Sequence, residues 1–207
     1  MKWPLAFALL AIAVLGGVDC AAKQDVWVPP RIDLREYGTL GLVEIRANLP
    51  YGKIATRKLM AALHDAQPGV PVLELGELAG VLRAVGHETL DPDAARAIGE
   101  RYRVDAVVVG DLAIEQPKPS WSVHSFTEAS ASADVHGSLD ARIFHTNSGA
   151  TIWSDSVAGK RTIASIDLAA GVRPRIDAVD PEGEEARLVG WLVGRVTRDF
   201  RGHWERR

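Results

Sequence analysis

The segment Val104-Asp-Ala-Val-Val-Val-Gly-Asp-Leu-Ala-Ile114 is a short, β-branched and nearly uncharged run in the middle of the chain. An apolar run of this length predicts a β-strand that is buried on both faces, as in the sheet of an α/β protein. Helix is the competing interpretation, but three consecutive valines and Gly110 disfavour it. We therefore expect Val107, Val108 and Val109 to lie deep in a sheet that is covered by helices on both sides.

The composition is that of an ordinary globular protein. The chain has 207 residues, of which 47% are hydrophobic and 25% are charged, and this length suits one domain with accessory segments. The formal net charge is −3. Because nucleic-acid-binding domains usually carry a strong basic excess, the charge gives no support for a nucleic-acid partner.

The amino terminus has the pattern of an export signal. Lys2 precedes the apolar run Leu5–Val18, which is too short to cross a hydrocarbon layer of ~30 Å as a helix. Cys20, the only cysteine, follows at once, where bacterial lipoproteins carry their acylated cysteine. The resemblance to a lipobox is imperfect, because Asp19 is neither small nor neutral. The alternative is cleavage after Ala22, which would remove the cysteine.

These features predict three regions. Residues 1–20 form a lipoprotein-type signal peptide, residues 21–31 form a tether that contains Pro29-Pro30, and residues 32–207 form a single α/β domain. No later segment approaches the length of a membrane-spanning helix.

The first half of the domain alternates strands and helices. Asp91 is expected to cap a helix that has Pro92 at its first position, and this helix leads into the strand at Val104. Alternation of this kind predicts a layered sheet with parallel neighbours. The other predicted elements here are strands at 40–45 and 70–75 and helices at 53–66 and 77–85.

The second half has a different pattern. Alternating apolar residues in Ala133–Phe144 and Ala150–Val157 predict an antiparallel hairpin, in which Gly137 marks a bulge. Leu188, Leu192, Val196 and Phe200 recur every four residues and predict a closing helix from Glu184 to Phe200. The remaining segments are expected to be an irregular loop at 115–127, a loop at 171–183 and a solvated end at 201–207. The predicted fold class is thus α/β: a mixed sheet with flanking helices, parallel in its first half, with a long C-terminal helix.

Three segments together resemble a known group of exported proteins. They are Leu40–Leu75, the Val-Asp-Ala-Val-Val-Val-Gly-Asp-Leu run, and the hairpin Ala141-Arg-Ile-Phe … Gly149-Ala-Thr-Ile-Trp-Ser154. The pattern is similar to the curli-secretion lipoprotein CsgG, to the lipoprotein activators of penicillin-binding proteins (LpoB), and to the amino-terminal domain of TolB. The resemblance implies an α/β domain, often lipid-anchored, that binds another protein or assembles in the cell envelope. The charges and prolines of 115–132 disfavour the membrane hairpins of a pore subunit.

Candidate site residues are few. Trp121, His124 and Phe126 are aromatic residues on a predicted polar loop and form the candidate partner surface. The alternative is that the loop folds back and buries them. His136 and His145 are weak candidates for a metal site, on the assumption that they face each other across the hairpin near Asp134. No nucleophile elbow, zinc-protease motif or phosphate-binding loop is present, so no catalytic residue, metal ligand or cofactor is predicted.

The sequence therefore predicts a bacterial envelope lipoprotein without chemistry of its own. It would be anchored in the periplasm through Cys20, with the outer membrane favoured, and would bind an envelope protein as an assembly or accessory factor. The prediction leaves homo-oligomerisation open. The alternatives are an exported hydrolase-like enzyme with an unidentified site and a subunit of a secretion pore.

Overall fold

The computed structural model describes residues 25–48, 51–125, 128–169, 175–178 and 181–206. These residues belong to two compact units. The larger unit runs from Pro29 to Gly202, and the smaller one combines the two ends of the chain, Met1–Val28 and His203–Arg207. None of the helices in the described part of the chain has the length and apolar character needed to span a bilayer.

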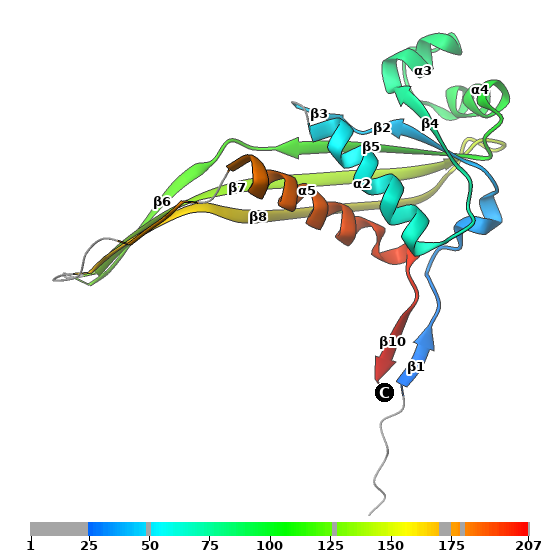
Figure 1. Cartoon of the computed structure of the whole chain (residues 1–207). Helices are drawn as coiled ribbons and strands as arrows, with labels where there is room; N and C mark the ends of the chain where they lie inside the picture. The colour runs from blue at the N-terminus through cyan, green and yellow to red at the C-terminus, as the bar shows by residue number, and fades with distance from the viewer. Residues whose placement is uncertain (1–24, 49–50, 126–127, 170–174, 179–180, 207) are drawn as a thin grey trace, which may run out of the picture. The chain divides into compact units, whose positions relative to one another are not determined.

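The larger unit is a mixed sheet with helices on both faces (Figure 1). Its strands lie in the order β4-β2-β5-β7-β8-β9, with β3 beside β5 and β6 beside β7. β2 is parallel to β4 and β5, whereas β7 is antiparallel to β5, β6 and β8. The elements are η1 (Leu34–Tyr37), β2 (Leu40–Glu44), β3 (Arg46–Ala47), α2 (Tyr51–Ala66), β4 (Val72–Glu77), α3 (Leu78–Ala84), α4 (Pro92–Tyr102), β5 (Ala106–Ile114), β6 (Lys118–Ser125), β7 (Glu128–His145), β8 (Thr151–Ala169), β9 (Arg175–Ala178), α5 (Pro181–Val196) and η2 (Thr197–Phe200).

β5 lies between two hydrophobic clusters, as its sequence predicts. Val108 is buried in the cluster that α2 and α5 cover, and Val107 is buried in the smaller cluster that α3 and α4 cover. Because successive side chains of a strand point to opposite faces, a continuous apolar run is what a strand covered on both sides requires. Val109 is only partly buried but also packs against the smaller cluster. The mixed α/β fold class is confirmed.

The capping pattern before β5 is also confirmed. The carboxylate of Asp91 accepts a hydrogen bond of 2.7 Å from the backbone N–H of Ala94, and Pro92 is the first residue of α4. This bond satisfies one of the amide groups that a helix leaves unpaired at its start. The helix ends at Tyr102 and is followed by Arg103, the C-cap residue, which has a left-handed φ of 55°.

The antiparallel hairpin is confirmed but is longer than predicted, with 18 residues in β7 and 19 in β8. The prediction of a bulge at Gly137 is wrong. Positions 135, 137, 139, 141 and 143 share one face of a regular strand, and Val135, Leu139, Ala141 and Ile143 are buried there. The irregularities lie in β8 instead, where the pairing passes over Ile152 and Ile163.

The end of the chain differs from the prediction in three places. α5 begins at Pro181, before Glu184, and the final turn that contains Phe200 is the 3₁₀ helix η2. Leu188, Leu192, Val196 and Phe200 are all buried, as their spacing predicts. The loop predicted at 171–183 includes a strand, β9, which pairs with β8. Short β9 has no clear sequence signature because its ladder partner lies elsewhere in the chain.

The smaller unit is described as a two-stranded antiparallel ribbon of β1 (Asp25–Val28) and β10 (His203–Arg206). Its strands come from the predicted tether and from the predicted solvated end. The exposure of 203–205 agrees with the predicted solvated end, but the prediction missed the strand β10. Neither strand shows a strong local signal, because each is only four residues long and finds its partner at the opposite end of the chain.

Candidate functional site

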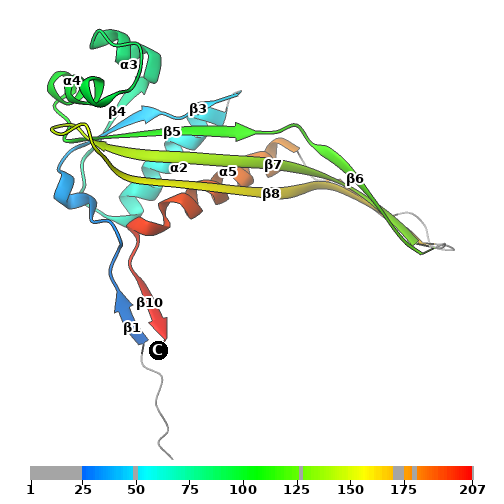
Figure 2. The ribbon, with the colours of Figure 1, turned by 180° about the vertical axis from the view of Figure 1, so that it is seen from behind.

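The sheet extends beyond its helices as a projecting arm. We define the arm as β6, β9, residues 128–134 of β7 and residues 162–169 of β8. β7 pairs with β5 only from Gly137 to His145, and towards Glu128 its partners are β6 and β8. Figures 1 and 2 show these strands running well past the start of α5. The arm therefore offers two sheet faces in the described structure where the body of the domain has helices.

Strand register divides the arm into a serine-rich and an apolar set of positions. Ser132 stands opposite Ser120 of β6 and Ser165 of β8, and the hydroxyls of Ser120 and Ser132 lie 2.8 Å apart. In the adjacent row of paired positions, Ala131 stands opposite Trp121 and Ile166. Since successive strand positions alternate between the two faces of a sheet, these two rows of positions belong to opposite faces. The further members of the apolar set are Pro119, Val123, Ala129, Ala133, Ala164 and Leu168.

The apolar face of the arm continues the face that α5 covers. β7 has no extra residue between Val135, which is buried in the larger cluster, and Ala131, so both positions belong to the same face. Ala131 and Ala133 are half-buried. A contiguous apolar face that the protein's own helices leave uncovered is a common feature of interaction sites.

Ionic contacts fix the root of the arm on its apolar side. Glu184, near the start of α5, is only 4% exposed and forms ion pairs with Arg161 of β8, at 2.7 Å, and with Arg187. The hydrogen bond from Arg161 outweighs burial and, with that from Arg187, holds the pKa of the Glu184 carboxyl below its usual range. α5 is thereby tied to β8 where the arm begins.

A second polar contact lies on the other face of the same strands. Asp134 accepts hydrogen bonds from the hydroxyl of Thr162 at 2.7 Å and from the ammonium group of Lys160 at 3.2 Å. These two hydrogen bonds lower the pKa of the Asp134 carboxyl. Thr162 immediately precedes Ile163, the extra residue of β8, so these bonds help to hold the register where the pairing shifts.

The structure changes the interpretation of the predicted partner surface. The loop predicted for 115–127 is wrong, because Lys118–Ser125 forms β6. Pro119 is compatible with this strand, since β6 lies at a sheet edge with β7 as its partner. Trp121 and His124 are therefore strand positions on the arm, whereas Phe126 and the predicted lipidation site Cys20 lie outside the described residues. The alternation of Ser with other residues in 118–125 is the signal that could have identified the strand.

The weak metal site is not assembled. His136 and His145 both belong to β7, nine residues apart, which is about 30 Å along an extended strand. They therefore do not face each other across a hairpin. His145 Nδ1 instead lies 3.2 Å from the hydroxyl of Ser148. The described residues contain no group of three or more histidine, cysteine, aspartate or glutamate side chains placed to hold a metal ion.

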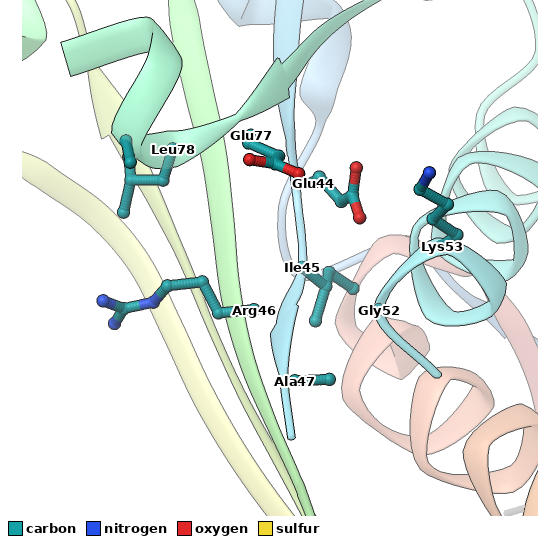
Figure 3. A pocket seen from close by; sticks show the side chains of 9 residues that line it. Glu44, Ile45, Arg46, Ala47, Gly52, Lys53, Glu77 and Leu78 are labelled. Atoms are coloured by element: carbon teal, nitrogen blue, oxygen red, sulfur yellow. The ribbon is translucent and has the colours of Figure 1, made fainter. Parts of the chain in front are cut away.

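A pocket that sequence reasoning missed lies at the carboxyl ends of the parallel strands β2 and β4 (Figure 3). Its volume is about 610 Å³. Figure 3 shows the carboxylate of Glu44 between Glu77 and the ammonium group of Lys53, above the apolar side chain of Ile45. The full lining is Glu44, Ile45, Arg46, Ala47, Gly52, Lys53, Glu77, Leu78 and Ala79.

This is the edge of an α/β sheet at which ligands commonly bind. The described lining supplies carboxylates and cations, but no hydroxyl or thiol that would serve as a nucleophile. The pocket forms because β2 pairs with β4. A single sequence does not show which strands pair, so the pocket could not be predicted from it.

No family model matches the chain, and neither does any curated protein. Several solved structures are partly similar in fold. A PelC dodecamer from Paraburkholderia phytofirmans is 14% identical, with 86% of this chain and 96% of that chain covered and a TM-score of 0.43. The lipoprotein GNA1162 from Neisseria meningitidis is 15% identical, with 77% and 97% covered and a TM-score of 0.37. The LpoB C-terminal domain from Salmonella enterica is 15% identical, with 64% and 84% covered and a TM-score of 0.36. Because these TM-scores lie below 0.5, the three structures carry no functional inference for this chain.

Proposed function

We propose that this chain is a bacterial cell-envelope lipoprotein that binds a protein partner through the apolar face of its arm. It acts as an assembly or accessory factor and has no chemistry of its own. The observation that carries the proposal is the two-faced arm, whose apolar positions continue a helix-covered sheet face past the start of α5. The finer kinship to the CsgG and TolB type remains a prediction from sequence.

The partner we propose is a protein with a complementary apolar surface. An apolar sheet face gains about 25 cal/mol for each Å² that is removed from water, whereas the serine positions gain little from burial. The polar contacts at the root favour a preformed arm, because Asp134 and Glu184 are already paired with cations there. A surface held in one conformation loses less entropy on binding than a flexible loop.

The test compares two adjacent positions of β7. Ala131→Asp places a charge on the apolar face, and Ser132→Asp places the same charge on the serine face. After crosslinking of the envelope from cells with a tagged chain, we expect Ala131→Asp to abolish the crosslinked product. We expect Ser132→Asp to retain it. Trp121→Ala should weaken the product, with an unchanged melting temperature.

If both aspartate variants fold normally and lose the crosslinked product equally, the apolar face is not the surface that determines partner binding. Retention of the product by Ala131→Asp would refute the proposed surface outright. Circular dichroism and thermal unfolding of both variants show whether either substitution disrupts the arm itself.

The proposed location is the periplasm, with the chain anchored through acylated Cys20 in a membrane, the outer membrane being favoured. The support for this anchor is the position of the only cysteine directly after the apolar run Leu5–Val18. Mass spectrometry of the chain purified from membranes tests it. Acyl chains on an amino-terminal Cys20 are expected, and an unmodified amino terminus at Lys23 would rule out the anchor.

The pocket beside β2 and β4 favours the enzyme alternative as a second candidate. If the chain turns over a generic hydrolase substrate, Glu44→Gln should remove that activity, because Glu44 lies between Glu77 and Lys53 in Figure 3. Activity that survives in Glu44→Gln would exclude the pocket as its source. The pore alternative predicts ring oligomers in detergent extracts.

A further inference from the structure

The ribbon of β1 and β10 places two tryptophans directly opposite each other. Trp27 pairs with Trp204 in the antiparallel register, and their rings meet edge-on with centroids 5.3 Å apart and an interplanar angle of 60°. Cross-strand aromatic pairs of this kind stabilise a two-stranded ribbon. The pair therefore supports a strand pairing between the two ends of the chain.

Contact between the rings still leaves a large part of both tryptophans exposed. Trp27 is 48% exposed and Trp204 is 68% exposed, and neighbouring Val26 is also exposed. An isolated two-stranded ribbon is marginally stable in water, and each of these strands has only four residues. The exposed rings thus predict an environment that is less polar than bulk water.

The ribbon begins close to the proposed anchor. Asp25 is five residues after Cys20, and five extended residues span at most about 18 Å. If acyl chains on Cys20 enter a bilayer, the start of β1 must lie within that distance of the anchored residue. Few environments other than the membrane surface are then within reach of the ribbon.

The chemistry of the ribbon matches the headgroup layer better than the hydrocarbon layer. Tryptophan has an apolar body and a polar N–H group, and it is enriched where membrane meets water. Asp25 and Glu205 lie in the same ribbon, and charged groups are costly at the bilayer centre. Their presence limits the depth that the ribbon can reach.

We propose that the β1–β10 ribbon rests in the headgroup layer of the membrane that anchors the chain, with Trp27 and Trp204 as its interfacial residues. This inference rests on the proposed lipid anchor at Cys20. Phospholipid covers the exposed aromatic surface, and the ribbon holds both ends of the chain at the membrane.

The experiment supplies the anchor chemically, so that it does not depend on natural acylation. The chain from Cys20 to Arg207 is coupled through its only thiol to a maleimide phospholipid in phosphatidylcholine vesicles. Brominated phosphatidylcholine then quenches the emission of any tryptophan that touches the bilayer. Trp27→Phe/Trp204→Phe keeps the ribbon aromatic and removes only the reporters, and Trp27→Ala/Trp204→Ala removes the aromatic surface. Trp191→Ala is the control, because Trp191 is also exposed but belongs to α5.

We expect strong quenching of the unmodified chain, loss of that quenching in both double variants, and no loss in Trp191→Ala. Quenching that persists in Trp27→Phe/Trp204→Phe would overturn the proposal, as would the absence of quenching in the unmodified chain. A dimer in solution that Trp27→Ala/Trp204→Ala dissociates would assign the ribbon to a second copy and would also overturn it. An absence of natural acylation, seen by mass spectrometry, would refute the lipoprotein proposal. It would not change the vesicle result, because the vesicle experiment supplies the anchor chemically.

Discussion

Gly137 of β7 stands directly opposite Gly159 of β8, and both lie against residues of α5. A Cβ atom on Gly137 would lie 2.8 Å from Cδ1 of Ile114 and 3.2 Å from a Cδ atom of both Leu188 and Leu192. A Cβ atom on Gly159 would lie 2.4 Å from Cζ3 of Trp191. The absence of two side chains thus lets α5 pack closely on the hairpin.

Gly137→Ala should lower the free energy of unfolding by about 1–3 kcal/mol, because overpacking displaces well-packed core side chains. Leu188 and Leu192 are fully buried, so they have little room to yield. Urea unfolding gives the measurement. Gly194→Ala is the control: nothing lies within 4 Å of a Cβ there, and alanine in a helix should add about 0.5–1 kcal/mol. A neutral Gly137→Ala would contradict the close packing.

Gln67 should be a major stabilising polar residue. Its Oε1 accepts from the backbone N–H of Leu34 at 2.6 Å, and its Nε2 donates to the carbonyls of Ile32 at 2.6 Å and Phe200 at 3.1 Å. Gln67→Met keeps the volume but leaves buried backbone groups without partners, at a cost of about 1–3 kcal/mol each. Thermal unfolding should show a clear fall in melting temperature, and Gln116→Met, at an exposed position, should show none.

Glu184 should make the free energy of unfolding depend on pH in the acidic range. Its pKa is lower in the folded chain than the ordinary value of 4.5, so its ion pairs with Arg161 and Arg187 contribute fully above that value. This contribution should disappear as the pH falls from 4.5 through the lowered folded pKa. Glu184→Gln should flatten the curve of unfolding free energy against pH in that acidic range. Glu185→Gln controls for the loss of one negative charge at the start of α5, and an unchanged slope in Glu184→Gln would contradict the assignment.

Alanine substitutions at Gly149 and Gly86 distinguish the cost of backbone strain from the cost of a steric clash. Both have positive φ, 69° and 77°, but a Cβ on Gly149 would lie 2.6 Å from backbone atoms of Pro92, whereas nothing lies within 4 Å at Gly86. Gly86→Ala should therefore cost only the left-handed strain of about 1–2 kcal/mol. Gly149→Ala should destabilise more, because the backbone of Pro92 cannot rotate away. Similar melting temperatures for the two variants would show that α4 shifts freely.

Much of the body of this fold follows from local pattern. The β-branched run Val107–Val109, the cap Asp91 with Pro92, and the four-residue spacing from Leu188 to Phe200 predict elements that the structure confirms. Each of these signals depends on residues close together in the chain. The arm was missed for the opposite reason. Serine and proline in 118–125 are typical of loops and outweigh the short alternation that indicates a strand, and the pairing partner β7 is not evident from the segment itself.

The amino-acid sequence by itself determined the α/β class, the buried central strand and the start of α4, because propensity, capping and periodicity act over a few residues. Tertiary structure alone decided that serine and apolar levels line up across the arm, that Glu44 and Glu77 meet at one sheet edge, and that Trp27 lies opposite Trp204. These juxtapositions join residues far apart in the chain. Their free energy comes from strand pairing and burial across the sheet, and no local pattern encodes which strand becomes the neighbour of which.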